Sequence, residues 1–151
     1  MPSGAPEGDP DCPFCEIVAR EDRDVREVYR DAEVVAFFPT EPATLGHTLV
    51  IPRTHVRDIW GMTPDQAAVI ARATLDVAHA IRRTISPDGL NVIQSNGEAA
   101  TQSVMHLHVH VVPRWRDDRL GRIWPPETNY SDAAKDEAWG KLRVALGELS
   151  T

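Results

Sequence analysis

The chain has 151 residues, of which 42% are hydrophobic, and this is enough for one domain with a buried core. Its formal net charge of −7 argues against non-specific binding to nucleic acid, which needs a basic surface. The sequence contains no apolar run of membrane-spanning length and no signal pattern at its start, so we expect a soluble, cytoplasmic protein without a membrane partner.

The N-terminal segment contains both cysteines of the chain. Residues 1–11 are rich in proline, glycine and acids, and we expect them to form a disordered tail ahead of a single domain over residues 12–151. The segment CPFCEIVARE, residues 12–21, predicts a short helix that carries Cys12 and Cys15. Because a reducing compartment disfavours a structural disulfide, this pair indicates metal ligation, redox chemistry or two buried thiols.

The next segments have the composition of β-strands. VREVYR (residues 25–30) and EVVAFF (residues 33–38) are rich in β-branched and aromatic residues and predict a hairpin. HTLVIP (residues 47–52) predicts a third strand that ends at Pro52.

The clearest helix of the sequence follows. Thr63 is suited to the N-cap, Pro64 to the first helical position and Gln66 to the third position of a capping box. Apolar residues then recur at helical spacing as far as Ile81, until the turn sequence SPDG. We predict one long helix from Thr63 to Ile85.

Two further strands are predicted at residues 90–95 and 104–113, and the second contains His106, His108 and His110. Successive side chains of a strand point to opposite faces, so these histidines are expected to share one face, roughly 6.6 Å apart along the strand.

The spacing of the histidines leaves two chemical interpretations open. Neutral imidazole is a common zinc ligand, and alternate strand residues can share one ion, which would make the protein a metalloenzyme. Alternatively, one imidazole nitrogen attacks phosphorus while the other nitrogen is held as a donor, which fixes the tautomer.

The loop before the histidines favours the second interpretation. Asn96, Gly97, Gln102 and Ser103 supply amide and hydroxyl groups and a flexible backbone. Neutral donors of this kind suit phosphate oxygens and indicate phosphoryl or nucleotidyl transfer.

A C-terminal extension begins at about residue 116, after which we predict one more helix over residues 131–149. Strands and helices do not alternate strictly, and hairpin-like neighbours dominate the first part of the chain. The pattern predicts an α+β fold with an antiparallel sheet.

The motifs resemble those of the histidine triad (HIT) superfamily. The family pattern His-φ-His-φ-His-φ-φ, with φ apolar, is complete over residues 106–112. GHTLVIPR at residues 46–53 and the pairs Asn96-Gly97 and Gln102-Ser103 match companion segments of the family.

This resemblance implies a nucleotide hydrolase or transferase that acts at an α-phosphate. The middle histidine, His108, would form a covalent nucleotidyl-histidine, and His110 would be its catalytic partner. The substrate would be a dinucleoside polyphosphate or a nucleoside phosphoramidate, bound without an organic cofactor. The substrate-binding residues implied are His47, Asn96, Gln102 and Ser103.

The resemblance also implies a structural zinc. Some branches of the family hold zinc on two such cysteines and two later histidines. Mapped onto this sequence, the ligands are Cys12, Cys15, His55 and His106, a closed tetrahedral set.

The family fold is an antiparallel sheet with a long packed helix, and its members dimerise by joining helix to helix and strand to strand. A homodimer is therefore expected, with a base cleft near Phe37 and Phe38.

One position departs from the family pattern. Relatives place Asp or Asn, which can bind a ribose hydroxyl, where this chain has Pro39, so that contact moves to Thr40 or Glu41 or is absent. The competing hypothesis is a nucleotide-binding regulatory or scaffold protein of the same fold with little turnover.

Overall fold

The computed structural model describes residues 8–20 and 24–149. The chain divides into two compact units, one ending at Leu120 and the other beginning at Gly121. Residues 1–7 of the expected tail lie outside the described residues. The carbonyl of Asp9 accepts a hydrogen bond from the Cys12 amide at 3.1 Å, immediately before the first helix.

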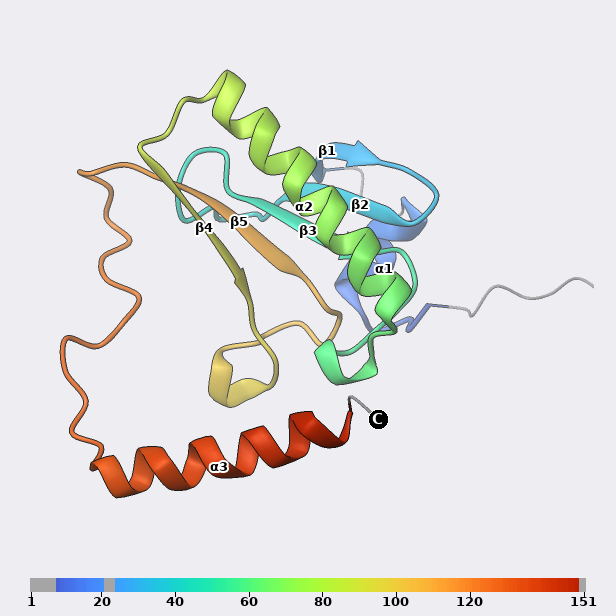
Figure 1. The fold of residues 1–151 in the computed structure, drawn as a ribbon. Helices are drawn as coiled ribbons and strands as arrows, with labels where there is room; N and C mark the ends of the chain where they lie inside the picture. The colour runs from blue at the N-terminus through green and yellow to red at the C-terminus, as the bar shows by residue number, and fades with distance from the viewer. Residues whose placement is uncertain (1–7, 21–23, 150–151) are drawn as a thin grey trace, which may run out of the picture. The chain divides into compact units, whose positions relative to one another are not determined.

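The first unit is built on a five-stranded sheet with the order β1-β2-β3-β5-β4, in which every neighbouring pair is antiparallel. Figure 1 shows the sheet with its helices, and the fold is α+β as the sequence predicts. The strands are β1 (Arg26–Arg30), β2 (Val34–Phe38), β3 (Thr48–Pro52), β4 (Gly89–Gln94) and β5 (Val109–Arg114).

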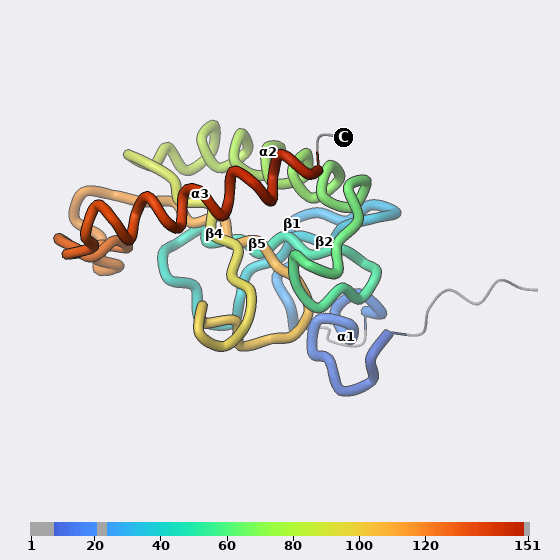
Figure 2. Tube along the Cα trace, turned by 60° about the horizontal axis from the view of Figure 1, so that its bottom comes forward, coloured from blue at the N-terminus to red at the C-terminus, as the bar shows by residue number. Residues whose placement is uncertain are grey.

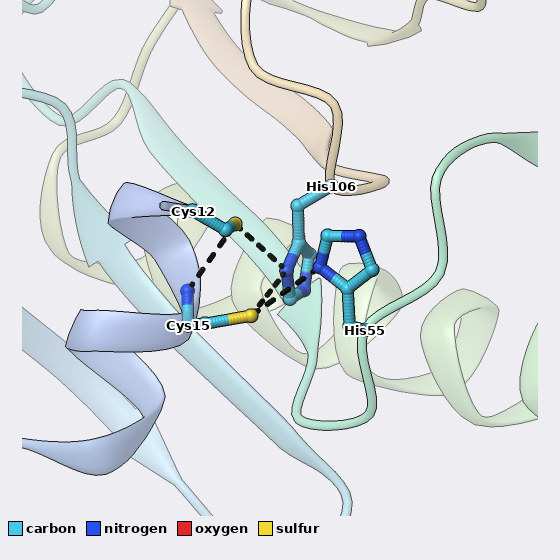
Figure 3. Close-up of side chains that lie close together, drawn as sticks. All are labelled: Cys12, Cys15, His55 and His106. Carbon is cyan, nitrogen blue, oxygen red and sulfur yellow. Dashed lines mark hydrogen bonds between the residues drawn. The ribbon is translucent and has the colours of Figure 1, made fainter. Parts of the chain in front are cut away.

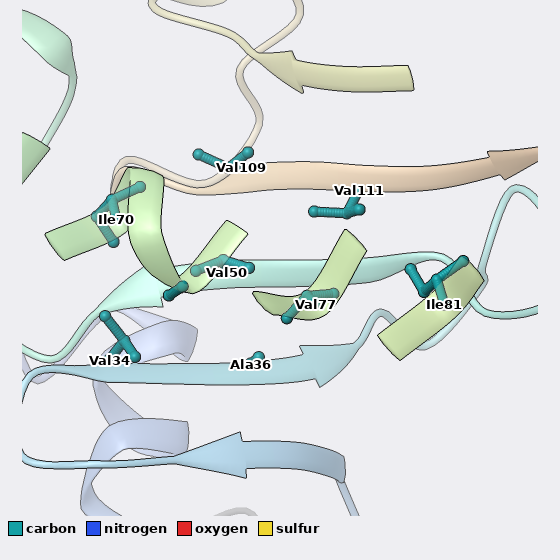
Figure 4. Packing of buried hydrophobic residues seen from close by; sticks show 9 residues of the cluster. Val34, Ala36, Val50, Ile70, Val77, Ile81, Val109 and Val111 are labelled. Atoms are coloured by element: carbon teal, nitrogen blue, oxygen red, sulfur yellow. The ribbon is translucent and has the colours of Figure 1, made fainter. Parts of the chain in front are cut away.

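The long helix α2 (Pro64–Thr84) lies across one face of this sheet (Figures 1 and 2). Its start is the predicted capping box: Thr63 Oγ1 accepts from the Gln66 amide at 3.2 Å, and Gln66 Oε1 accepts from the Thr63 amide at 2.9 Å. The core between helix and sheet is entirely aliphatic (Figure 4). Its members are Val34, Ala36, Val50, Ile70, Ala73, Val77, Ile81, Val109 and Val111.

The short helix α1 (Pro13–Ala19) packs on the opposite face of the sheet (Figure 2). Phe14 and Ile17 contact the strand residues that alternate with those beneath α2, because neighbouring strand side chains point to opposite faces. Those strand residues are Val35, Phe37, Leu49 and Ile51. The other end of α1 is held by the Arg30 guanidinium, which donates to the carbonyls of Ile17 and Val18 at 2.8 Å each.

The histidine-bearing strand is shorter than predicted. β5 begins at Val109 rather than at residue 104, so His106 and His108 lie in the segment that leads into the strand. The predicted start of the strand is wrong because backbone pairing stops at Val109, which makes the last pair of β5 with both β3 and β4. Pro52 of β3 has no amide to donate to a longer strand. Leu107, between the two histidines, is fully buried, and its amide donates to the Val56 carbonyl at 2.6 Å.

The second unit contains α3 (Asp132–Glu148), with Ser131 as its N-cap, in agreement with the predicted C-terminal helix. None of its residues is buried. Two single-turn 3₁₀ helices, η1 (Ile59–Gly61) and η2 (Glu98–Ala100), complete the elements of the described chain. Among the described residues, no helix is both long enough and apolar enough to cross a membrane.

Candidate active site and metal site

A cavity of about 490 Å³ lies beside the histidines on the α1 side of the sheet. His108, His110 and Ser103 form one part of its wall. Phe37 and Phe38 also line it, at the end of β2 where the base cleft is expected. Pro39 and Thr40 follow at its edge.

His108 is buried, and one side of its ring is fixed by the main chain. Its Nδ1 atom lies 2.8 Å from the carbonyl oxygen of His106. Since a carbonyl oxygen can only accept, Nδ1 carries the proton and Nε2 carries the lone pair. The ring is therefore the tautomer that an attack by Nε2 requires.

A second pair of histidines has its tautomers fixed in the same manner. The Ala43 amide donates to Nδ1 of His47 at 3.0 Å, so the proton of this imidazole is on Nε2. That Nε2 lies 2.9 Å from Nδ1 of His110, which must accept, and the proton of His110 is consequently on its own Nε2. The pair presents one neutral N–H donor to the site.

Burial keeps these three imidazoles neutral. It lowers the pKa of His47 and His108, and it lowers the pKa of His110 to about 4, to which the neighbouring His108 and His47 also contribute. At pH 7 the cavity wall therefore has an unprotonated imidazole nitrogen on His108 and a neutral N–H donor on His110.

Neither Asn96 nor Gln102 is among the residues that line the cavity. Gln102 is buried, and its amide binds three main-chain atoms: the Gly97 amide at 2.8 Å, the Arg57 carbonyl at 2.7 Å and the Val104 carbonyl at 3.1 Å. Asn96 exchanges two hydrogen bonds of 2.8 Å with Gln94, and its Oδ1 accepts from the Ile59 amide at 2.7 Å. Both amides hold the loop in place.

Phe14 is a cavity residue that sequence reasoning missed. Its ring meets the ring of His108 edge-on, with centroids 5.2 Å apart at 88°, and it meets Phe37 at 5.4 Å. Its position between the two cysteines of CPFC could have indicated this role, because a ligand that binds both thiols also fixes the residue between them.

The structure brings Cys12, Cys15, His55 and His106 together from three separate segments (Figure 3). Their ligand atoms all lie within 4.8 Å of one another. Cys12 Sγ is 3.5 Å and Cys15 Sγ is 3.6 Å from His106 Nδ1, and Cys15 Sγ is 3.3 Å from His55 Nδ1.

This donor set fits zinc. Zinc bonds to sulfur and nitrogen imply tetrahedral edges of about 3.3–3.8 Å, and the shorter separations in this group are of that size. His106 Nε2 donates to the Pro52 carbonyl at 2.8 Å, which leaves the Nδ1 lone pair facing the thiols. Burial, followed by the Cys12 side chain, raises the pKa of Cys15 to about 11, so a cation bound here must displace a proton.

Comparison with known proteins gives consistent matches. A family model described as the HIT domain matches residues 20–117. Protein hit from Bacillus subtilis is 42% identical over 114 residues, which are 75% of this chain and 78% of that protein. Adenylylsulfatase HINT3 from Arabidopsis thaliana is 30% identical over 118 residues, 78% of this chain and 58% of that protein.

Among solved structures, a zinc-bound histidine triad family protein from Mycobacterium smegmatis is 35% identical, with a TM-score of 0.69 over 93% of this chain and 96% of that one. The histidine motif of this sequence lies within the matched segment. The chain therefore belongs to the HIT family, a superfamily of nucleotide-binding hydrolases and transferases.

Proposed function

We propose that the protein is a nucleotide hydrolase or nucleotidyl transferase that acts at an α-phosphate. Its substrate is a nucleoside phosphoramidate or a dinucleoside polyphosphate, and the reaction passes through a covalent nucleotidyl group on His108. The observation that carries this proposal is the bond between His108 Nδ1 and the His106 carbonyl, which leaves the lone pair on Nε2 of a ring lining the cavity.

In the first step, the Nε2 lone pair of His108 attacks the α-phosphorus and the bond from phosphorus to the leaving group breaks. The leaving group takes a proton from water. The His110 Nε2–H donates a hydrogen bond to an oxygen of the transferred group, and the Ser103 hydroxyl lies at the same cavity. The neutral state of His110 avoids a fixed positive charge that would retain the anionic product.

In the second step, water attacks phosphorus on the nucleotidyl-histidine, the phosphorus–nitrogen bond breaks and His108 regains its lone pair. The proton of the attacking water passes to solvent. If another hydroxyl compound replaces water, the same intermediate gives transfer instead of hydrolysis.

His47, Gln102 and Asn96 support this chemistry without contacting the phosphate. His47 sets the tautomer of His110, and Gln102 and Asn96 hold the loop that carries Ser103. The plant relative is named an adenylylsulfatase, which agrees with reaction at an adenylyl phosphate.

We also propose a zinc ion bound by Cys12, Cys15, His55 and His106. Its role is structural rather than catalytic, because four protein ligands leave no open coordination position. Such a site is compatible with a cytoplasmic protein, since a reducing compartment keeps both cysteines as thiols. No organic cofactor takes part.

The proposal is tested by replacing His108 with asparagine. We expect His108→Asn to lower kcat for a nucleoside phosphoramidate by about three orders of magnitude or more, since the nucleophile is removed. His79→Asn is the matched control, because His79 is an exposed histidine on α2, and it should retain full activity.

Full activity of the His108→Asn variant would overturn the proposal. Tight binding of nucleotide by a wild-type protein without turnover would instead favour the regulatory or scaffold function.

A further inference from the structure

Phe14 lies between the two thiols in sequence and contacts the nucleophile in space. Cys12 is the N-cap of α1 and its sulfur accepts from the Cys15 amide at 3.4 Å, so a cation held by both sulfurs also holds the backbone between them. The Phe14 ring packs edge-on against His108, and against His106 with centroids 5.9 Å apart. The first turn of α1 is thereby connected to the ring that attacks.

His106 provides a second connection. Its side chain belongs to the metal group, while its carbonyl oxygen is the acceptor for His108 Nδ1 at 2.8 Å. The ring of His106 is fully buried and donates to the Pro52 carbonyl, so a shift of the backbone at this residue would move its ring and its carbonyl together. One residue therefore serves both sites.

The wall of the cavity also depends on α1, which contributes Pro13, Phe14, Glu16 and Ile17 to its lining. A helix of 7 residues is not stable by itself, and its position must come from its anchors. Arg30 binds its C-terminal carbonyls, Phe14 and Ile17 pack on the sheet, and the pair of thiols lies at its N-terminus.

We infer that cation binding by Cys12, Cys15, His55 and His106 controls the geometry of the active site. The bound cation fixes the positions of Phe14 and of the His106 carbonyl. These two groups together orient His108 and complete the nucleotide pocket. Phe14 is thus a positioning residue. The inference rests on the proposed function for the role of His108.

The test uses the whole chain, reduced and stripped with a chelator, to which zinc alone is then added. Long-range ¹H–¹⁵N spectra report the tautomer of His108, and calorimetry reports the affinity for adenosine 5′-monophosphate. We expect zinc to bring His108 to a single Nδ1–H tautomer and to tighten nucleotide binding about tenfold, because a preorganised pocket loses less conformational freedom on binding.

A variant that keeps all four ligands separates this role from simple stability. Phe14→Leu should bind zinc as the wild type does, yet its nucleotide affinity should stay about tenfold weaker after zinc is added, because the ring that orients His108 is missing. Val18→Ala is the control, because Val18 lies on the same helix and lines a different cavity beside Cys15. It should respond to zinc as the wild type does.

The inference is overturned if zinc fails to bind, or if it binds and leaves the His108 spectrum and the nucleotide affinity unchanged. It is also overturned if Phe14→Leu responds to zinc fully. Neither readout requires turnover, so these results would not contradict the proposed function. The proposed function would be contradicted by full activity of His108→Asn.

Discussion

At the scale of single residues, His47 and His110 form a chain of hydrogen bonds with only one consistent arrangement of protons. The Ala43 amide is its first donor, and each imidazole then accepts at Nδ1 and carries its proton at Nε2. Protonation of His110 at Nδ1 would remove the acceptor for His47, and burial opposes it as well. The neutral pair is therefore part of what stabilises the folded site.

Because His47 and His110 are neutral in the folded protein, we predict that the free energy of unfolding depends on pH. The pKa of His110 is lowered from 6.5 to about 4, so between these values the unfolded chain binds more protons than the folded one. The free energy of unfolding should fall as the pH falls from about 6.5 toward about 4. Chemical denaturation at pH 7 and pH 5 should show a smaller loss for His110→Gln than for the wild type.

His79→Gln serves as the control for this experiment, because it removes an exposed histidine of α2 in place of a buried one. Parallel losses in the wild type and in His110→Gln would contradict the assignment of His110 as a buried neutral group.

Residue identities could be predicted from sequence more readily than residue contacts. The family resemblance predicted that Cys12, Cys15 and His55 approach His106. It did not predict where the amide of Gln102 points, since that depends on carbonyls of residues 57 and 104, which the sequence does not place.

At the scale of elements, the connection into β3 depends on a glycine in the left-handed region. Gly46 has φ +92°, and a Cβ at this position would lie 2.5 Å from Cδ1 of Ile85 and 3.2 Å from Cγ of Pro113. His47 follows directly, so the glycine lets the chain pass close to the end of α2 and still deliver the imidazole to His110.

Gly46→Ala should therefore destabilise the protein by about 1–3 kcal/mol, through a strained backbone and a clash that Ile85 must relieve. Denaturant unfolding measures the change. Gly61→Ala is the matched control, because its added Cβ would meet only Val56 at an ordinary 3.6 Å and its φ lies outside the left-handed region. Equal stability of both variants would refute the argument.

Elements with complete local signals were predicted well. The helix α2 has its cap, its proline and its apolar stripe within one stretch of sequence, and its bounds agree with the prediction. The start of β5 was not predictable in the same way, since it is set by where β3 and β4 stop pairing with it.

At the scale of the whole molecule, the two edges of the sheet carry exposed apolar residues. Val28 on β1 is 50% exposed and Val92 on β4 is 54% exposed, while Leu75 on α2 is 56% exposed. A dimer that joins helix to helix and strand to strand would cover apolar surface and remove one unpaired edge. We propose that β4 and α2 form this interface.

Val92→Lys should shift the protein toward monomer and raise the dimer dissociation constant at least about tenfold, since a charge would be buried at the paired edge. Sedimentation equilibrium measures the shift. Val28→Lys, which places the same charge on the opposite edge, should leave the dimer intact. A monomeric wild type, or equal effects of the two changes, would contradict this interface.

The α+β architecture could be predicted from the order of strand-like and helix-like segments together with the family resemblance. Assembly could not be derived from the pattern itself, because an exposed apolar residue on an edge strand has the same sequence signature whichever edge it occupies. Val28 and Val92 illustrate this point, and only the strand order distinguishes them.

In the proposed mechanism His108 carries the nucleotidyl group, and intact-protein mass spectrometry tests this step most directly. The protein is incubated with an adenylated phosphoramidate and quenched under alkaline conditions, because phosphorus–nitrogen bonds to histidine are labile in acid. We predict a mass increase of one adenylyl group, located on His108 by peptide fragmentation and absent from His108→Asn. Turnover without such an adduct at any time point, or an adduct on another residue, would contradict the mechanism.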